Sequence, residues 1–228
     1  MKQKGEGTWV VGTANTNETF HGVINNNDQA GTHPGTTSIE KQRSGDWRLT
    51  GKNDYSGTTT VTSGRLIVNG QHTGKGSITV RKGAILAGKG SLTGATTIND
   101  GGILQVGDTL ATDKGLTFNG GLKLNSGAIL RLNEAMMETD FKAGDQINVF
   151  TGKATGEFDD IQPATPGEGL VWDTSELYAS GLLKVTTSSS ISHIRMEKNN
   201  GAVYDLSGHR HTKAGKGIII QNGRKYTN

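Results

Sequence analysis

The sequence contains no cysteine, which excludes a disulfide framework, a thiolate nucleophile and any metal site built on thiolates. No run of 18 apolar residues occurs, so no segment is suited to cross a membrane as a helix. Residues 1–5 lack the apolar stretch of a signal peptide, so we expect either a cytosolic protein or a piece of a longer one. Hydrophobic residues make up only 32% of the 228 and aromatic residues 5%, too little for a compact globule. The classes that remain are a disordered chain and a fold with a thin interior.

Acidic and basic residues nearly balance, and the small basic excess lies at one end of the chain. The formal net charge is +3. Residues 191–228 hold seven basic and two acidic residues, so they carry +5 and residues 1–190 carry −2. A stripe of basic residues with interleaved aromatic residues would indicate nucleic-acid binding, and the body of the chain has none. We therefore expect no nucleic-acid partner.

Glycine is abundant, with 35 residues, and much of it is regularly spaced. Gly45, Gly64, Gly83 and Gly101 lie 19, 19 and 18 residues apart, a repeat length typical of solenoids. Large apolar residues recur at fixed distances from these glycines and from Gly127. Two residues after each glycine come Trp47, Leu66, Ile85, Ile103 and Ile129, and three residues before the later four come Val61, Val80, Ile98 and Leu124.

Each repeat is too short to bury a core of its own, so neighbouring repeats must share one. Residues 59–62 and 77–80 are rich in β-branched side chains, which suit a half-buried strand. Glycine supplies the positive φ that tight corners between strands need. Stacked coils pair each strand with those above and below at about 4.8 Å and point apolar residues into one interior. The sequence therefore predicts an all-β fold, a right-handed parallel β-helix, and not disorder.

The most specific motifs are Gly-x-Trp-x-Leu-x-Gly over residues 45–51 and Asn-x-Tyr-x-Gly-x-Thr-x-Val over residues 53–61. Related phrases follow at residues 88–108 and 122–130. Together they resemble the autotransporter-associated β-strand repeat over about residues 4–133. The resemblance implies a passenger β-helix displayed at the surface of a bacterium.

The first residues also resemble the repeat. Residues 7–9 match residues 45–47, and the pair Phe20 and Gly22 parallels Tyr55 and Gly57. We therefore expect the chain to begin inside a solenoid, with more protein upstream, because solenoid ends normally carry polar caps. Residues 25–37 are polar and contain Pro34, which predicts a loop.

Residues 133–140 interrupt the pattern and predict a helical turn, with Asn133 as its N-cap and Glu134 in its first turn. Met136 and Met137 are expected to fill one end of the interior. Strand-like sequence resumes at residues 145–150. Residues 156–185 again resemble the repeat family where its solenoid ends, and we expect large rings to close the stack there, namely Phe158, Trp172 and Tyr178.

Residues 186–190 form a polar linker by composition. Residues 203–225 resemble a type IX sorting domain, and Asn222-Gly223 predicts a two-residue hairpin turn. His211 and Ile219 depart from that pattern, which has Val and Tyr there. The resemblance implies that secretion machinery recognises the tail. We therefore expect three parts: β-helix repeats over residues 1–132, the last coils and a C-terminal cap over residues 133–187, and a linker with a small β tail over residues 188–228.

No set of residues indicates catalysis or metal binding. A glycosidase needs two carboxylates on one groove at about 5–9 Å. Asp159 and Asp160 are adjacent and would point to opposite faces of a strand, while Asp100 and Asp108 lie near turns. Of the six histidines, His209 and His211 could share a strand face and hold a metal, but no third ligand is nearby; the others are His21, His33, His72 and His193. We assign no catalytic, cofactor or metal site.

The remaining candidate surface is rich in hydroxyl and amide groups: Thr58, Thr59, Thr60, Thr62, Asn69, Thr96 and Thr97. Such a face either docks sugars or protein strands or is simply solvated. We expect a non-enzymatic, secreted or cell-surface bacterial β-helix protein, a display scaffold or adhesin fragment with a glycan or host-matrix ligand. The alternative is a carbohydrate-active β-helix enzyme, a polysaccharide lyase or glycosidase, with acids drawn from several coils.

Overall fold

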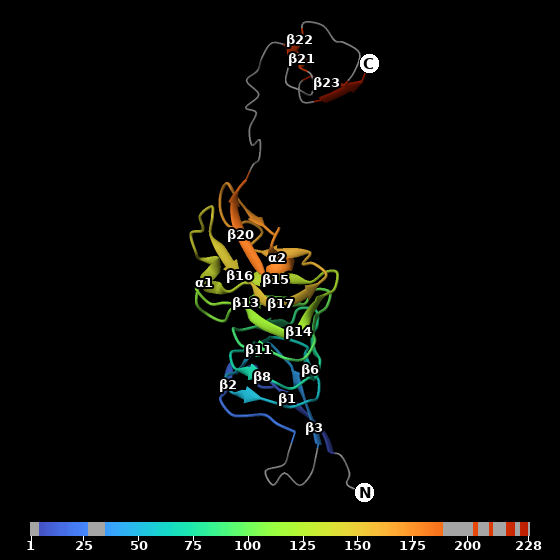
Figure 1. Cartoon of the computed structure of the whole chain (residues 1–228), viewed down its shortest axis with the longest axis vertical. Helices are drawn as coiled ribbons and strands as arrows, with labels where there is room; N and C mark the ends of the chain where they lie inside the picture. Colours follow the sequence, from blue (N-terminus) through green and yellow to red (C-terminus); the bar gives the residue numbers. More distant parts are fainter. Residues whose placement is uncertain are drawn as a thin grey trace. The chain divides into compact units, whose positions relative to one another are not determined.

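The computed structural model describes residues 5–26 and 35–188 and, beyond them, the backbone of four short strands within residues 203–227. The chain divides into two compact units, Met1–Ser188 and Ser189–Asn228. In the first unit, short strands stack one above another along the long axis (Figure 1). The further division of this unit at residue 132 stays a prediction.

Two parallel sheets form the body of the first unit. The ten-stranded sheet combines two stacks that meet at one long strand, β14. Its strands are β1 (Gly5–Val11), β3 (Gly35–Lys41), β5 (Lys52–Asn53), β6 (Thr59–Val61), β8 (Gln71–His72), β9 (Ile78–Val80), β11 (Ser91–Leu92), β12 (Thr96–Ile98), β14 (Leu116–Leu124) and β17 (Phe150–Thr155). The seven-stranded sheet comprises β2 (Glu18–Phe20), β4 (Asp46–Leu49), β7 (Arg65–Val68), β10 (Ile85–Ala87), β13 (Ile103–Val106), β15 (Ile129–Leu132) and β18 (Asp160–Gln162).

The pairing registers confirm the parallel β-helix. In the seven-stranded sheet, each residue of one inward column pairs with its neighbours in the coils above and below: Trp47, Leu66, Leu86, Leu104 and Leu130. In the ten-stranded sheet, Val61, Val80, Ile98 and Leu124 form a second inward column, as the sequence predicts. All nine side chains are buried in one continuous core. Because no coil could bury these residues alone, stacking is what stabilises the fold.

The predicted core positions of the later coils are off by one residue. Ile85, Ile103 and Ile129 are only half-buried on the outer side, whereas the next residues, Leu86, Leu104 and Leu130, point inward. In these coils two residues separate the glycine from the inward position, and in the first two coils only one does. Because strand side chains alternate between faces, this single extra residue exchanges the two faces.

The predicted alignment of the first coil is also wrong. Trp9 pairs with Ile39 and not with the Trp47 column, and Phe20 pairs with Leu49 and not with Tyr55. Paired residues of β1 and β3 are 30 positions apart in the sequence, so the 38 residues from Gly7 to Gly45 do not represent two repeats. Of the predicted loop at residues 25–37, residues 35–37 lie in β3, and residues 27–34 lie outside the described part.

The C-terminal end of the stack is closed by a cap. Helix α1 (Glu134–Met137) has Asn133 as N-cap, as predicted, with its Oδ1 accepting from Met136 N at 2.9 Å. Met136 is buried, but Met137 is 40% exposed, so only the first fills the interior. A three-stranded antiparallel sheet follows, made of β16 (Gln146–Asn148), β20 (Leu182–Thr187) and β19 (Leu170–Asp173), with helix α2 (Leu177–Ser180).

The predicted rings close this end. Phe158 and Tyr178 lie 6.3 Å apart between ring centroids, and Trp172 packs on Phe141 at 5.4 Å. All four rings belong to the core or pack against it. The predicted linker begins later than residue 186, because β20 continues through Thr187.

The second unit contains a four-stranded antiparallel sheet with β21 (Val203–Tyr204), β22 (Arg210–His211), β23 (Ile218–Gln221) and β24 (Arg224–Thr227). Gln221 pairs with Arg224, so two residues connect β23 to β24. The predicted turn residues, Asn222 and Gly223, lie outside the described residues, as does His209. The likeness of this unit to a sorting domain stays a prediction.

Candidate functional site

The outer side of the ten-stranded sheet carries an array of hydroxyl groups. In β6, β9 and β12 the middle residue points outward between two buried neighbours. These middle residues are Thr60, Thr79 and Thr97, and the pairing register places them side by side on successive coils. We define the hydroxyl face as these three threonines and the neighbouring outward residues Ser38, Thr58 and Ser77.

The hydroxyl face is flat and chemically available. The hydroxyl groups of Thr60, Thr79 and Thr97 form no hydrogen bond within residues 5–26 and 35–188. Parallel strands place them about 4.8 Å apart. Glu40 precedes Thr60 in the same column, and Lys123 follows Thr97, so residues of opposite charge flank the three threonines. Each hydroxyl can donate one hydrogen bond and accept others.

The predicted polar surface is only partly correct. Thr58, Thr60, Thr62 and Thr97 lie on the outer side of the sheet, but Thr59 and Thr96 are buried at 2% and 1% exposure. The Thr62 hydroxyl already donates to Lys41 O at 2.8 Å. Asn69 follows β7 and binds Asp108 instead of joining the face.

Directly beneath this face, the interior of the early coils is polar. The Tyr55 hydroxyl bonds Thr59 Oγ1 at 2.7 Å, and burial raises the pKa of Tyr55 to about 12. Asn53 Oδ1 accepts from Ile24 N at 2.9 Å. The His72 ring lies 4.2 Å from the Tyr55 ring, and its Nδ1 accepts from Gly74 N at 3.1 Å. These bonds satisfy polar groups that would otherwise be buried without partners.

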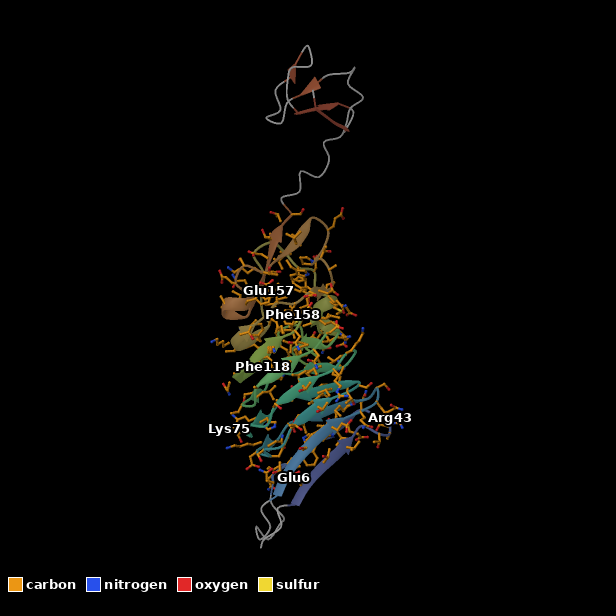
Figure 2. The ribbon with its side chains drawn as sticks, turned by 90° about the vertical axis from the view of Figure 1, so that its right-hand side faces the viewer. Glu6, Arg43, Lys75, Phe118, Glu157 and Phe158 are labelled. Atoms are coloured by element: carbon orange, nitrogen blue, oxygen red, sulfur yellow. The ribbon has the colours of Figure 1, made fainter. Side chains whose placement is uncertain are left out.

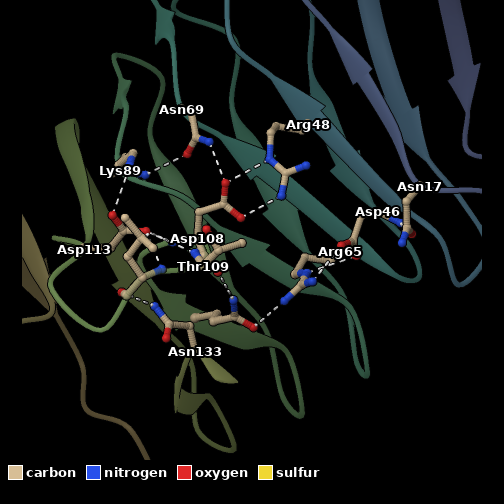
Figure 3. A network of polar contacts seen from close by, with 12 residues as sticks. Asn17, Asp46, Arg48, Arg65, Asn69, Lys89, Asp108, Thr109, Asp113 and Asn133 are labelled. Carbon is tan, nitrogen blue, oxygen red and sulfur yellow. Dashed lines mark hydrogen bonds and ion pairs between the residues drawn. The ribbon is translucent and has the colours of Figure 1, made fainter. Parts of the chain in front are cut away.

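A second polar assembly covers the outer side of the seven-stranded sheet (Figure 3). Its centre is a loop of residues 107–115 between β13 and β14, which we call the strap. Leu104 and Leu130 occupy equivalent places 26 residues apart, against 18 for Leu86 and Leu104, so this coil holds eight extra residues. The strap uses them to reach earlier coils.

Two aspartates anchor the strap. Asp108 accepts from Arg48 Nε at 2.9 Å and Nη2 at 2.8 Å, and from Asn69 Nδ2 at 2.7 Å. Asp113 pairs with Lys89 Nζ at 3.0 Å, and its other oxygen accepts three backbone N–H groups of the strap. Burial alone would raise the pKa of Asp113, but these donors outweigh it and lower the pKa to about 2. The same balance between burial and hydrogen bonds lowers the pKa of Asp108.

Beside the strap, Arg65 continues the network. It pairs with Asp46 at 2.6 Å and Glu134 at 3.0 Å and donates to Gln105 Oε1 at 3.1 Å. Gln105 is fully buried although it lies on an outer column. Each carboxylate of this network pairs with a guanidinium or ammonium group or accepts hydrogen bonds from N–H groups. The network therefore stabilises the fold and leaves none of its carboxylates unpaired.

The remaining candidate residues do not come together in one site, and some of them lie outside the described residues. Asp100 is exposed near a turn. Asp159 and Asp160, predicted to face opposite ways, both line one cavity of about 350 Å³ at the cap. The described residues contain no group of three or more His, Asp or Glu side chains placed to hold a metal ion. His211 lies in β22, and the position of its side chain is outside the described part.

Comparison with known proteins agrees with the architecture. The Passenger-associated-transport-repeat family matches residues 39–68 and 84–106, which hold β3 through β7 and β10 through β13 in part. A relative named "Adhesin BmaC autotransporter", from Brucella suis biovar 1 (strain 1330), is 35% identical over 107 residues. That match covers 44% of this chain and 3% of the relative, so the chain spans a small part of its length.

No solved structure matches the chain. In the part that the structure describes, no helix is long and apolar enough to cross a membrane. Two of the coils that match the repeat family are those that present Thr60 and supply Arg48 and Arg65 to the network around the strap. The matched residues include Thr60 and Thr97 of the hydroxyl face but neither Thr79 nor the strap, so the similarity to passenger repeats covers only part of each polar outer surface.

Proposed function

We propose that this chain is a non-enzymatic, exported β-helix segment that acts at the bacterial surface and binds a glycan through the hydroxyl face. The observation that carries the proposal is the row of uncommitted hydroxyls on Thr60, Thr79 and Thr97. The match to a passenger repeat and the printed name of the relative, an adhesin, support surface display.

The chemistry of a flat hydroxyl row suits a sugar better than a protein side chain. A sugar ring presents several hydroxyls, each of which both donates and accepts, and so do the threonines. Each new hydrogen bond replaces one to water and contributes only about 0.5–1.5 kcal/mol, so one subsite binds weakly. Successive coils repeat the subsite, and a polymeric glycan that spans several subsites gains avidity.

A glycan array probed with the full chain tests this directly. Thr60→Val, Thr79→Val and Thr97→Val combined should abolish binding, because valine keeps the β-branched shape and removes the hydroxyl. A matched control replaces another outward hydroxyl column, Ser91→Ala, Thr117→Val and Thr151→Val, and should bind as the wild type does.

A blank array would refute the glycan proposal, and binding to fibrous matrix proteins instead would make the face a protein-docking surface. Release of reducing sugar from a polysaccharide panel would refute the non-enzymatic assignment.

Export is a separate part of the proposal. We propose that residues 191–228 direct secretion, which their net charge of +5 and their likeness to a sorting tail support. Removing them should leave the first unit folded, since the two units are compact separately, and should abolish surface display. Unchanged surface labelling of the truncated protein would contradict this role.

A further inference from the structure

The C-terminal cap contains a cavity that the hydroxyl face does not involve. It measures about 350 Å³ and lies between β18 and β19. Its acidic side comes from Asp159 and Asp160 and its apolar side from Phe158, Ile161, Val171 and Trp172. Figure 2 places Phe158 next to Glu157 where the last coil meets the cap. The volume is sufficient for one amino-acid side chain or one sugar ring.

Both carboxylates keep an oxygen free. Asp159 Oδ2 accepts from Gly127 N at 2.8 Å, and Asp160 Oδ2 accepts from Gln162 Nε2 at 2.9 Å. Their Oδ1 atoms have no hydrogen-bond partner within residues 35–188. No Lys, Arg or His lines the cavity, whereas the carboxylates of the strap are all paired. Two unneutralised acids at one depression favour a cation.

The apolar wall suits the rest of a cationic side chain. Trp172 Nε1 donates to Pro163 O at 2.7 Å, so the indole is held in place and its N–H is not available to a ligand. An ordered indole face attracts a cation through its quadrupole. Val171, which is 37% exposed, and Ile161 offer apolar surface to the methylene stem of arginine or lysine.

We propose that this cavity binds the guanidinium or ammonium group of an arginine or lysine side chain presented by a partner protein. The cation pairs with the carboxylates of Asp159 and Asp160, and its stem lies against the apolar lining that includes Trp172. A neutral sugar would also donate its hydroxyls to these carboxylates, and Thr174 adds a hydroxyl to the lining. The two adjacent negative charges favour a cation over such a neutral ligand, and the dependence on salt distinguishes the two.

The test uses the full chain labelled with ¹⁵N, because its three tryptophans give three separate indole N–H signals. Titration with N-acetyl-arginine methylamide should shift the Trp172 signal and leave those of Trp9 and Trp47 unchanged. N-acetyl-citrulline methylamide, a neutral compound of nearly the same shape, should not shift it. Raising the salt from about 0.05 M to about 0.5 M should weaken the arginine effect.

Asp160→Asn keeps the shape of the exposed acid and should weaken binding about fivefold, the size expected for one partly exposed ion pair. Asp54→Asn, an exposed acid in an early coil, is the matched control and should leave binding unchanged. Thermal melts of both variants establish that they fold.

Equal shifts with citrulline, or an unchanged affinity in Asp160→Asn, would overturn the proposal. A Trp172 shift produced by methyl glucoside and not by arginine would make the cavity a sugar subsite. No shift up to about 50 mM of the arginine probe would exclude binding of a single side chain. The threonine variants do not alter any residue that lines the cavity, and Asp160→Asn does not alter the hydroxyl face, so the two proposals fail separately.

Discussion

Acid should weaken this β-helix through one residue, His72. Its side chain is 2% exposed, and the ring packs on Tyr55 within the interior. Because Nδ1 accepts the Gly74 N–H, the proton of the neutral ring sits on Nε2, which has no partner in the described part of the chain. Protonating Nδ1 would break that bond and bury a charge. Burial therefore lowers the pKa of His72 to about 4, although the nearby Asp54 carboxylate opposes the shift.

The sign and size of the effect follow from linkage. The ring takes up a proton near pH 6.5 in the unfolded chain but only near pH 4 in the folded one. Stability is therefore complete above pH 6.5 and is lost as the pH falls from 6.5 to 4. Each unit in this window costs about 1.4 kcal/mol, so at about pH 5 the loss is about 2 kcal/mol. This is a large share of the total stability of an ordinary domain.

Urea unfolding at about pH 7.5 and about pH 5 measures this loss. His72→Leu places in this column the residue that the next coil already has, Leu92, and should reduce the difference in unfolding free energy between the two pH values by about 2 kcal/mol. His21→Gln, at an exposed histidine, is the control and should keep the full difference. An equal pH dependence in wild type and His72→Leu would refute the reasoning.

Three further changes test the packing. Leu104→Ala should lower the free energy of unfolding by about 2–5 kcal/mol, as loss of a buried leucine does, whereas Ile103→Ala should lower it by less than half as much. Equal melting temperatures of the two variants would contradict the inward position of Leu104. Lys41→Met removes the ammonium that donates to the carbonyls of Gln42, Arg43 and Ser63 and should cost about 1–3 kcal/mol in urea unfolding, while Lys52→Met, at an exposed lysine, should cost nothing measurable. A double-mutant cycle with Arg48→Ala and Asp108→Ala should give a coupling of about 1–2 kcal/mol for this two-bond pair, and strictly additive effects would mean that the strap is not fastened there.

The architecture was predictable because its cause is periodic. Glycine spacing and the apolar residues before each corner identify the coils, and Val61 and Val80 were placed correctly. The faces of the later strands were not predictable from spacing, because one additional residue at the corner, such as Ala84, moves Ile85 outward and Leu86 inward. Local sequence carries no sign of this insertion, since alanine and isoleucine both suit a buried position.

The two polar surfaces show the same limit. Thr58, Thr59 and Thr60 are identical residues, so no hydrophobic alternation tells which one points inward; only the pairing register and the Tyr55 hydroxyl show that it is Thr59. The sequence does not predict the strap, because the bonds that hold it join distant residues. Arg48 and Asp108 are 60 positions apart, and the one signal available was the additional length of that coil.

Polar residues inside a solenoid connect its interior to its surface. In β6 the buried Thr59 holds the Tyr55 hydroxyl, and the next residue, Thr60, presents its own hydroxyl outward. Tyr55 in turn packs on the ring of His72, which burial keeps neutral. The His72 ring is therefore connected to the hydroxyl face through Tyr55 and Thr59. In the next coils the same inward column holds the apolar residues Leu92 and Phe118, which have no titratable group. The early coils therefore combine an exposed hydroxyl row with the part of the core most sensitive to acid, and any ligand that holds these strands in register must also oppose protonation of His72.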